Sequence, residues 1–433
     1  MNIAFHTLGC KLNFSETSFI ADEVKKFGYK EVDFNKNADI YVINTCTVTE
    51  NANKECQYLV RKALKKNPYA KTVVMGCYAQ LKPKEIAQIK GVDLILGNNE
   101  KFKLKKYLER LEKRETAEII IKKSSKLDSF KASFSFGNRT RSFLKVQDGC
   151  NYKCTFCTIP LARGKSRSDN IENIIRRIIK LKEDGIKEVV LTGINLGDFK
   201  TIQSKKLIDL LEEINKIEQI RVRISSIEPN LLDRKIINLI RKSKVLLPHF
   251  HIPLQSGSDE VLKLMKRRYL TKHYRDLINT INKTIPNACI GVDVIVGFPG
   301  ETDRHFNETV NFIKSLKVSY LHVFSYSERE NTEAKNMTGH IDVNIKKIRS
   351  QILRNLSDKK RQSFYQNNIG KTHSVLFENQ DKYGYIYGFT ENYIKIKSKY
   401  ELNMQNSLKK VKINKIEYNN LTYASGQIIN TEQ

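Results

Sequence analysis

Along the first hundred residues, short apolar runs alternate with stretches whose apolar positions recur at helical spacing. The runs at 2–8, 39–44, 72–75 and 93–96 predict buried strands, and the stretches at 16–27 and 53–66 predict amphipathic helices. Strands that alternate with helices form parallel sheets with helices packed on their faces. We therefore predict a doubly wound α/β domain over residues 1–110.

A polar segment interrupts this pattern, and the alternation then resumes at greater length. Lys101 opens a basic helix, and residues 111–138 are predicted to be a linker. Further strands are predicted at 143–147, 188–192, 221–225, 249–253, 288–296 and 320–325, with helices between them. Six consecutive βα units predict a partial (β/α)6 barrel of the TIM type over residues 139–365.

The C-terminal residues 366–433 follow a third pattern. A helix is expected at 341–365, and short runs at 374–377, 384–388, 393–397, 409–416 and 421–423 are separated by turn residues. Many short strands of this kind predict a small all-β barrel. The expected fold class is α/β, with a doubly wound N-terminal domain, a partial barrel and a C-terminal all-β barrel.

The charge and the cysteine count add a partner and a chemistry to this outline. A formal net charge of +29 favours a polyanionic partner such as nucleic acid, although a lysine-rich surface without a partner is the alternative. No signal peptide and no membrane-length apolar window is recognised, so we expect a cytoplasmic protein without a membrane partner. Eight cysteines in such a protein indicate metal binding or catalysis rather than disulfides.

Cys150, Cys154 and Cys157 share one short loop after the predicted strand 143–147. Three thiolates in one loop can bind three irons of a cubane cluster, which leaves the fourth iron open for a substrate. A zinc site or reactive thiols are the alternatives, but structural zinc takes four ligands and no fourth lies nearby. The loop is expected at the carboxyl mouth of the barrel, where the active sites of such barrels lie.

Three further cysteines, Cys10, Cys46 and Cys77, each follow a predicted strand of the N-terminal sheet. The carboxyl ends of parallel strands meet at one edge, so we expect these thiols to converge there and favour a second cluster. Three buried core thiols are the alternative interpretation. Cys56 and Cys289 are interpreted as core thiols and receive no role.

The spacing from Cys150 to Cys157, with Phe156 before the last cysteine, resembles the radical S-adenosylmethionine superfamily. The resemblance implies that the open iron chelates the methionine group of S-adenosylmethionine and that Phe156 lies beside its adenine. Glycines and polar residues at later strand ends are weaker candidates for the same ligand. The residues expected to contact S-adenosylmethionine are Phe156, Thr192, Gly193, Ser225, Glu228, Gly297 and Gly300.

Segments across nearly the whole chain also resemble the methylthiotransferase family within that superfamily. They include 7–13 (TLGCKLN), 44–48 (NTCTV), 75–77 (MGC), 147–150 (QDGC) and 293–302 (DVIVGFPGET). The resemblance implies a methylthiotransferase domain, a radical domain and a C-terminal TRAM domain that binds RNA. It also implies two 4Fe–4S clusters, held by the two cysteine trios.

The first cysteine motif separates the branches of this family. Its Gly-Cys-Lys form is similar to the MtaB-type branch, which methylthiolates carbon 2 of N6-threonylcarbamoyladenosine at position 37, in the anticodon loop of tRNA. One S-adenosylmethionine would donate the methyl group and a second would serve as the radical source. A flavodoxin or ferredoxin is the expected electron donor, and the sulfur donor stays open. The alternatives are isopentenyladenosine in tRNA, a ribosomal protein aspartate, or a non-catalytic metal-stabilised RNA-binding module.

Overall fold

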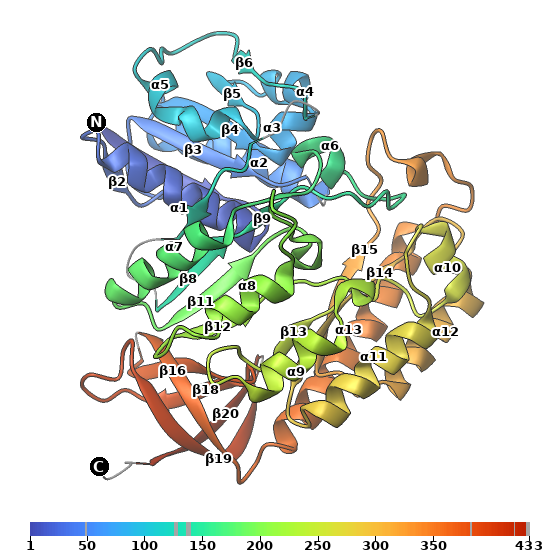
Figure 1. The fold of residues 1–433 in the computed structure, drawn as a ribbon. Coiled ribbons are helices and arrows are strands. Elements are labelled where there is room, and N and C mark those ends of the chain that lie inside the picture. The colour runs from blue at the N-terminus through green and yellow to red at the C-terminus, as the bar shows by residue number, and fades with distance from the viewer. Residues whose placement is uncertain (48–49, 125–128, 136–139, 382, 420, 430–433) are drawn as a thin grey trace.

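The computed structural model describes residues 1–47, 50–124, 129–135, 140–381, 383–419 and 421–429. The chain forms three stacked parts, with the N-terminal sheet at the top of Figure 1, an open barrel in the middle and a small closed barrel at the bottom. Among the described helices, none combines the length and the apolar composition that crossing a bilayer requires.

The N-terminal sheet has six parallel strands in the order β2-β1-β3-β4-β5-β6. Ile43 and Val74 belong to the core shared with α2, whereas Val42 and Val73 belong to the core shared with α1 and α5, so helices cover both faces. The elements are β1 (Asn2–Thr7), α1 (Lys11–Lys25), β2 (Lys30–Val32), β3 (Ile40–Thr45), α2 (Glu50–Lys66), β4 (Lys71–Gly76), α3 (Cys77–Leu81), α4 (Pro83–Ala87), β5 (Leu94–Leu96), α5 (Leu104–Leu108) and β6 (Glu118–Ile120). The predicted doubly wound fold is confirmed.

Two features of the predicted linker region differ from expectation. Lys101 was expected to open a basic helix, but it lies in the short 3-10 helix Glu100–Lys103 and is fully buried. The segment 111–138 contributes β6 to the N-terminal sheet and β7 (Ser133–Phe134) to the central sheet. Strands of two or three residues escape sequence patterns because their neighbours, rather than their own periodicity, define them. The domain boundaries stay predictions.

The central part is an open barrel of six parallel strands, with the short antiparallel strand β7 added at one edge. The sheet β12-β11-β8-β7 and the sheet β13-β14-β15 are joined by bridges from Val222 to Leu246 and from Ser226 to His251. Strands β7 and β15 are therefore its edges. The elements are β8 (Arg141–Lys145), α6 (Ile159–Arg163), α7 (Ile171–Glu183), β11 (Glu188–Thr192), α8 (Leu207–Ile214), β12 (Arg221–Ile224), α9 (Arg234–Lys242), β13 (His249–His251), α10 (Asp259–Leu264), α11 (Thr271–Thr284), β14 (Cys289–Val296), α12 (Asp303–Ser315) and β15 (Tyr320–Ser325). The predicted partial barrel is confirmed.

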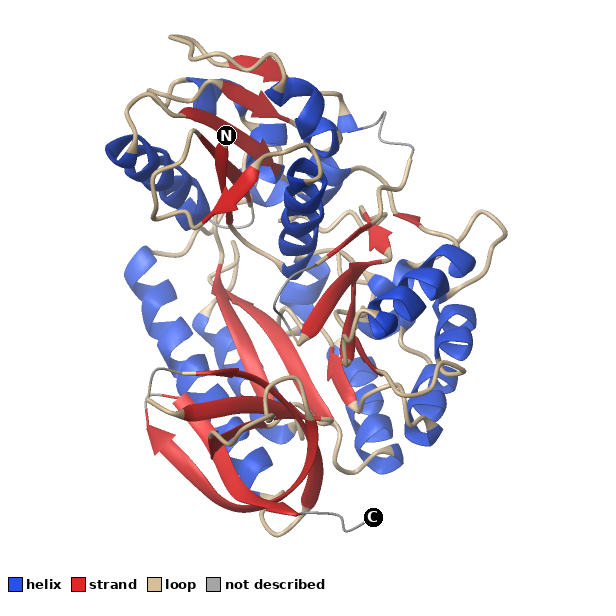
Figure 2. Cartoon of the chain, turned by 90° about the vertical axis from the view of Figure 1, so that its left-hand side faces the viewer, coloured by secondary structure: helices blue, strands red, loops and turns tan. Residues whose placement is uncertain are grey.

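The C-terminal part is a closed five-stranded barrel, as predicted, in the order β16-β17-β18-β20-β19. Its elements follow the long helix α13 (Val343–Gln366) and are β16 (Thr372–Gln380), β17 (Tyr385–Thr390), β18 (Lys395–Lys399), β19 (Leu408–Asn419) and β20 (Leu421–Ile429). Figure 2 shows it directly below the central strands.

Buried arginines fix the closed barrel to the amino-terminal ends of the central strands. Arg223 donates to the backbone oxygens of Thr390 at 3.3 Å and Glu391 at 3.2 Å, while its Nε donates to Glu188 at 2.9 Å. Arg141 pairs with Glu378 at 2.5 Å. The closed barrel therefore blocks the bottom of the open barrel and leaves the carboxyl mouth to the N-terminal domain.

Candidate functional site

The loop with Cys150, Cys154 and Cys157 lies at the carboxyl mouth of the open barrel, between β9 (Gln147–Asp148) and α6. The Gln147 side chain holds this loop in place. Its Nε2 donates to the backbone oxygen of Gly149 at 2.7 Å, and its Oε1 accepts from the backbone N–H of Ile194 at 2.8 Å. The loop is thereby tied to the end of β11.

The surroundings of these sulfur atoms fit thiolates that bind a metal cluster. The Tyr152 backbone N–H lies 3.4 Å from Cys150 Sγ, and Arg267 Nη1 lies 3.0 Å from Cys154 Sγ. Burial raises the pKa of Cys150 to about 11 and that of Cys157 to about 12, so these thiols ionise readily only when a metal binds them. N–H donors and a guanidinium that point at sulfur are the partners that cluster thiolates need.

Cys10, Cys46 and Cys77 come together at the carboxyl ends of the adjacent strands β1, β3 and β4. A Cβ atom on Gly9 would lie 2.7 Å from Cys46 Sγ, so only glycine lets these two loops approach. Cys10 and Cys77 are also close enough for their charges to interact. The convergence that the predicted topology implied is thus present in the fold.

Glycine is required before Cys77 as well. Gly76 has a φ of 105°, and a Cβ atom there would lie 2.4 Å from Asn44 Oδ1. Asn44 is fully buried, and this oxygen has no hydrogen-bond partner among the described residues. The bare backbone at Gly9 and Gly76 thus leaves space beside the cysteines, as a cluster requires.

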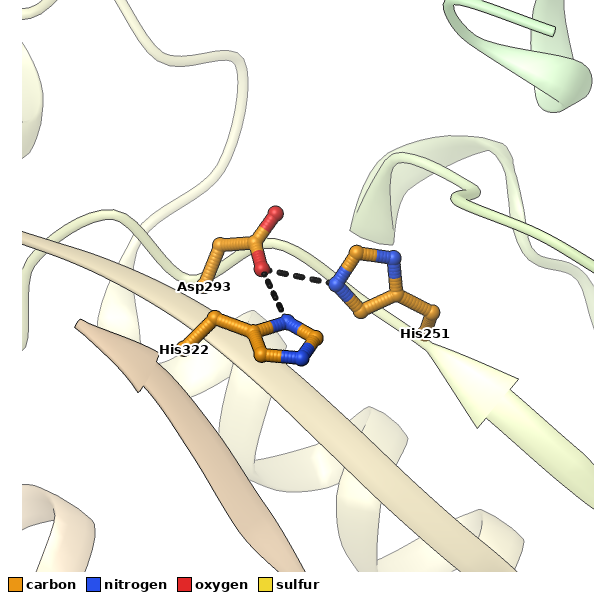
Figure 3. Close-up of side chains that lie close together, drawn as sticks. All are labelled: His251, Asp293 and His322. Atoms are coloured by element: carbon orange, nitrogen blue, oxygen red, sulfur yellow. Dashed lines mark hydrogen bonds and ion pairs between the residues drawn. The ribbon is translucent and has the colours of Figure 1, made fainter. Parts of the chain in front are cut away.

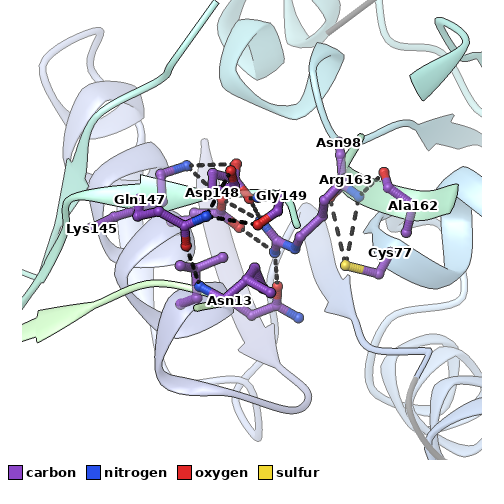
Figure 4. Close-up of polar contacts among 12 residues, drawn as sticks. Asn13, Cys77, Asn98, Lys145, Gln147, Asp148, Gly149, Ala162 and Arg163 are labelled. Atoms are coloured by element: carbon purple, nitrogen blue, oxygen red, sulfur yellow. Dashed lines mark hydrogen bonds and ion pairs between the residues drawn. The ribbon is translucent and has the colours of Figure 1, made fainter. Parts of the chain in front are cut away.

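Helices α3 and α6 pack against each other and bring the two trios to one seam. Cys77 is the first residue of α3, and Cys157 lies two positions before the start of α6. Asn98 connects the two sides, because its Nδ2 lies 3.6 Å from Cys77 Sγ and 2.9 Å from the backbone oxygen of Ala162 (Figure 4). Sequence analysis did not identify Asn98, since nothing local marks it.

A buried ionic network joins the domains at the same seam. Glu16, on α1, accepts from Lys101 at 2.6 Å, Lys145 at 2.8 Å and Arg163 at 3.0 Å, and Arg163 also pairs with Asp148 at 3.0 Å. Burial alone would raise the pKa of Glu16, but Arg163, Lys101 and Lys145 hold it well below its usual value. The cysteine loop and the N-terminal domain are therefore linked by buried charges, and loss of one partner would leave an uncompensated charge in the interior.

Several residues expected to contact S-adenosylmethionine lie at the mouth with free polar groups. The hydroxyl groups of Thr192 and Ser225 are buried without a hydrogen-bond partner among the described residues. The same holds for both polar side-chain atoms of Asn195, which was not among the expected contacts. Glu228 forms an ion pair with Arg267, the residue that also contacts Cys154. Unsatisfied buried groups at such a site fit a polar ligand.

Phe156 lines a cavity of about 220 Å³ beside the cysteine loop, together with Cys157, Asp293, Phe324 and Arg329. Its ring meets that of Phe298 edge-on, with centroids 6.3 Å apart. This cavity is the space next to the cysteine loop in which a flat ring can be enclosed between aromatic walls.

The glycines in the expected ligand set have packing reasons of their own. A Cβ on Gly193 would lie 2.8 Å from Gln147 Oε1, and one on Gly297 would lie 2.3 Å from Lys346 Cγ on α13. Gly300 has a φ of 83°, a conformation that favours glycine. Their contact with S-adenosylmethionine stays a prediction.

Three cysteines in one loop at the carboxyl mouth of a partial barrel define the class of radical S-adenosylmethionine enzymes. The model of the Radical SAM superfamily matches residues 144–313, and that of the Uncharacterized protein family UPF0004 matches residues 2–97. The fold resembles the radical S-adenosylmethionine methyltransferase TsrM of Kitasatospora setae, with a TM-score of 0.56 at 13% identity over 77% of each chain. It also resembles the cobalamin-dependent radical enzyme OxsB, with a TM-score of 0.51 at 11% identity over 84% of this chain and 56% of that one.

Sequence relatives identify the family. The chain is 42% identical to the threonylcarbamoyladenosine tRNA methylthiotransferase MtaB of Aquifex aeolicus, over 92% of this chain and 96% of the relative. It is 40% identical to the protein of the same name in Bacillus subtilis, over 99% and 96%. The tRNA-2-methylthio-N(6)-dimethylallyladenosine synthase of Staphylococcus haemolyticus is 34% identical, over 87% and 75%. The chain belongs to the radical S-adenosylmethionine methylthiotransferase family and is an enzyme.

Proposed function

We propose that this enzyme methylthiolates carbon 2 of N6-threonylcarbamoyladenosine at position 37 of tRNA. The observation that carries the choice of substrate is the order of identities. Relatives named for threonylcarbamoyladenosine reach 42% and 40%, whereas relatives named for dimethylallyladenosine reach 34%. A net charge of +29 suits the RNA partner.

The two cysteine trios are proposed as the ligands of two 4Fe–4S clusters. In this family the clusters and two molecules of S-adenosylmethionine supply the adenosyl radical and the methylthio group. The chain itself keeps the sites in position, since Arg267 stabilises the Cys154 thiolate and Gln147 holds the loop on the barrel. Arg163 and Asn98 lock the two sites together across the seam. Hydrogen removal from an aromatic carbon is radical chemistry, so positioning and exclusion of water are the protein's main tasks.

The C-terminal barrel is proposed to be a TRAM-type RNA-binding domain. Its described surface carries lysines over tyrosine rings, with Lys395 Nζ 4.7 Å from the Tyr423 centroid and Lys397 Nζ 4.1 Å from that of Tyr385. Lysines can bind phosphates and tyrosines can stack on bases. A cytoplasmic location and a flavodoxin or ferredoxin as electron donor complete the proposal.

The test is mass spectrometry of tRNA nucleosides from a deletion strain that carries either the wild-type gene or a variant. The methylthio form of threonylcarbamoyladenosine should disappear on deletion and return with the wild type. Cys10→Ala and Cys150→Ala should both fail to restore it, while Cys56→Ala, which changes a buried thiol that belongs to neither trio, should restore it. An unchanged nucleoside profile on deletion would refute the proposal, and loss of the dimethylallyl derivative instead would reassign the substrate.

The division of labour between the trios has its own assay. Cys10→Ala should still cleave S-adenosylmethionine to 5′-deoxyadenosine under reducing conditions, because the loop with Cys150 stays intact. Cys150→Ala should lose that cleavage. Equal cleavage by both variants would contradict the assignment.

A further inference from the structure

A polar cluster that includes neither cysteine trio lies on the inner wall of the open barrel. His251 Nε2 and His322 Nδ1 both contact Asp293 Oδ1, at 2.7 Å and 3.0 Å (Figure 3). The three residues come from the adjacent strands β13, β14 and β15. Interior positions of such barrels are normally filled by apolar side chains, so this layer of charge needs an explanation.

The polar cluster of His251, Asp293 and His322 adjoins the cavity beside the loop with Cys150, Cys154 and Cys157. Asp293 lines that cavity together with Ile295, the next inward-facing residue of β14, and with Phe156 from the loop itself. Two residues of a strand span about 7 Å, so Asp293 lies one layer deeper in the barrel than the part of the cavity nearest the mouth. A target base that entered this cavity on the side of Phe324, with Phe156 left to the adenine of S-adenosylmethionine, would therefore direct a substituent on its far edge toward Asp293.

The cavity is open to a large substrate through the edge of the barrel. Strand β15 is an edge strand, and its inward residues His322 and Phe324 remain 50% and 41% exposed. Phe324 also lines the cavity. An exposed aromatic ring at the entrance is a platform on which an unstacked base can lie, and single-stranded RNA is recognised in this way.

The hydrogen bonds of the cluster determine what it offers to a ligand. Burial works to raise the pKa of Asp293, but the bonds from His251 and His322 lower it, so the group is a carboxylate that only accepts. Each imidazole nitrogen that contacts it therefore carries a proton. The second oxygen of Asp293 points away from both rings (Figure 3).

We propose that His251, Asp293 and His322 form the subsite that binds the N6 substituent of the target adenosine. Asp293 accepts hydrogen bonds from the N–H and hydroxyl groups of a threonylcarbamoyl substituent, and His251 and His322 hold the carboxylate in position. Arg329, a cation that lines the same cavity, suits the carboxylate of that substituent. This subsite rests on the proposed function, and it explains how the enzyme rejects an apolar dimethylallyl group, which would leave buried acceptors unpaired.

The experiment measures binding of the reconstituted holoenzyme to three anticodon stem-loops that carry threonylcarbamoyladenosine, dimethylallyladenosine or adenosine at the target position. Wild type should prefer the first. In Asp293→Asn the imidazoles keep the amide oxygen and the amide NH2 faces the substituent, so this preference should fall about 10- to 100-fold, with little change in affinity for the adenosine stem-loop. His322→Leu should weaken the same preference. His273→Gln, on the outer helix α11, is the matched control.

The outcomes separate this subsite from the proposed function. If wild type methylthiolates the threonylcarbamoyl stem-loop and both cluster variants keep the full preference, the subsite is wrong and the function stands. If wild type methylthiolates only the dimethylallyl stem-loop, the proposed substrate fails, and the subsite with it. Two histidines and one carboxylate are also a metal-binding set. Stoichiometric zinc, nickel or cobalt in the holoenzyme that is lost in His322→Leu would replace the substrate subsite with a metal site.

Discussion

Replacing Glu16 with glutamine tests whether the buried network holds the N-terminal domain on the radical domain. The Glu16 carboxylate is fully buried and lies within 3.0 Å of nitrogen atoms of Lys101, Lys145 and Arg163. Glutamine has nearly the same shape but no charge, so three buried cations would keep only Asp148 as a counter-ion within the network. Removing one partner of a buried ion pair costs about 3–5 kcal/mol, and we expect a loss of that size.

The matched control is Glu23→Gln on the same helix. Glu23 pairs with Lys26 at 2.7 Å, but its side chain is 45% exposed, and such surface pairs contribute about 0–1 kcal/mol. Urea unfolding measures the overall stability of each variant. Hydrogen exchange locates the change, and we expect the backbone amides of α1 and α6 to show the largest increase in exchange rate in Glu16→Gln. Equal losses in the two variants would refute the structural role of the network.

The stability difference between wild type and Glu16→Gln should also depend on pH. The pKa of Glu16 is lower in the folded state than the unfolded value of about 4.3, so its contribution is complete above about pH 5 and is lost as the pH falls. The stability difference between wild type and Glu16→Gln should therefore be constant from neutral pH to about 5 and shrink below about 4. A difference that grows on acidification would contradict the assigned charge.

Other predictions concern the two cysteine sites. Gly76→Ala should destabilise the chain by about 2–4 kcal/mol, because alanine there would have both a positive φ and a clash. Gly28 has a φ of 85° but nothing within 4 Å of a Cβ atom placed there, so Gly28→Ala should cost only about 1 kcal/mol. Thermal or urea unfolding measures both losses. Anaerobic iron and sulfide analysis should show that Cys46→Ser loses one cluster's content and Cys56→Ser loses none; iron unchanged in both would remove the second cluster. Arg267→Gln should make the reduction potential of the loop cluster more negative, since a cation next to one sulfur is lost, and an unchanged potential in a redox titration would show that the guanidinium does not tune it.

Local periodicity was enough to predict most of the framework. The strands expected at 188–192 and 320–325 correspond to β11 (Glu188–Thr192) and β15 (Tyr320–Ser325) without a shift. Their β-branched and aromatic residues favour a strand through local propensity, so the pattern can be recognised without the rest of the chain. The short strands β2, β6 and β7 were missed, because they exist only through the backbone of a longer neighbour.

Much of the candidate site could also be predicted from the sequence. The six cysteines were recognised from spacing and from their positions after strands, and the order of parallel strands then brought Cys10, Cys46 and Cys77 to one edge. Gly9 and Gly76 carried a readable signal too, since only glycine permits the close approach there.

The sequence by itself thus determined the three-part fold, the two cysteine trios and the class of chemistry, because each shows in local periodicity, in a short motif or in a cysteine placed directly after a predicted strand. Only the tertiary structure decided that Lys101 is a buried partner of Glu16, 85 positions away, and that His251, Asp293 and His322 share one layer of the barrel wall. Such pairings follow from strand register and helix docking, which join distant residues and leave no local periodicity to detect. The physical reason is that propensity and spacing act over a few residues, whereas burial of charge is set by the whole fold.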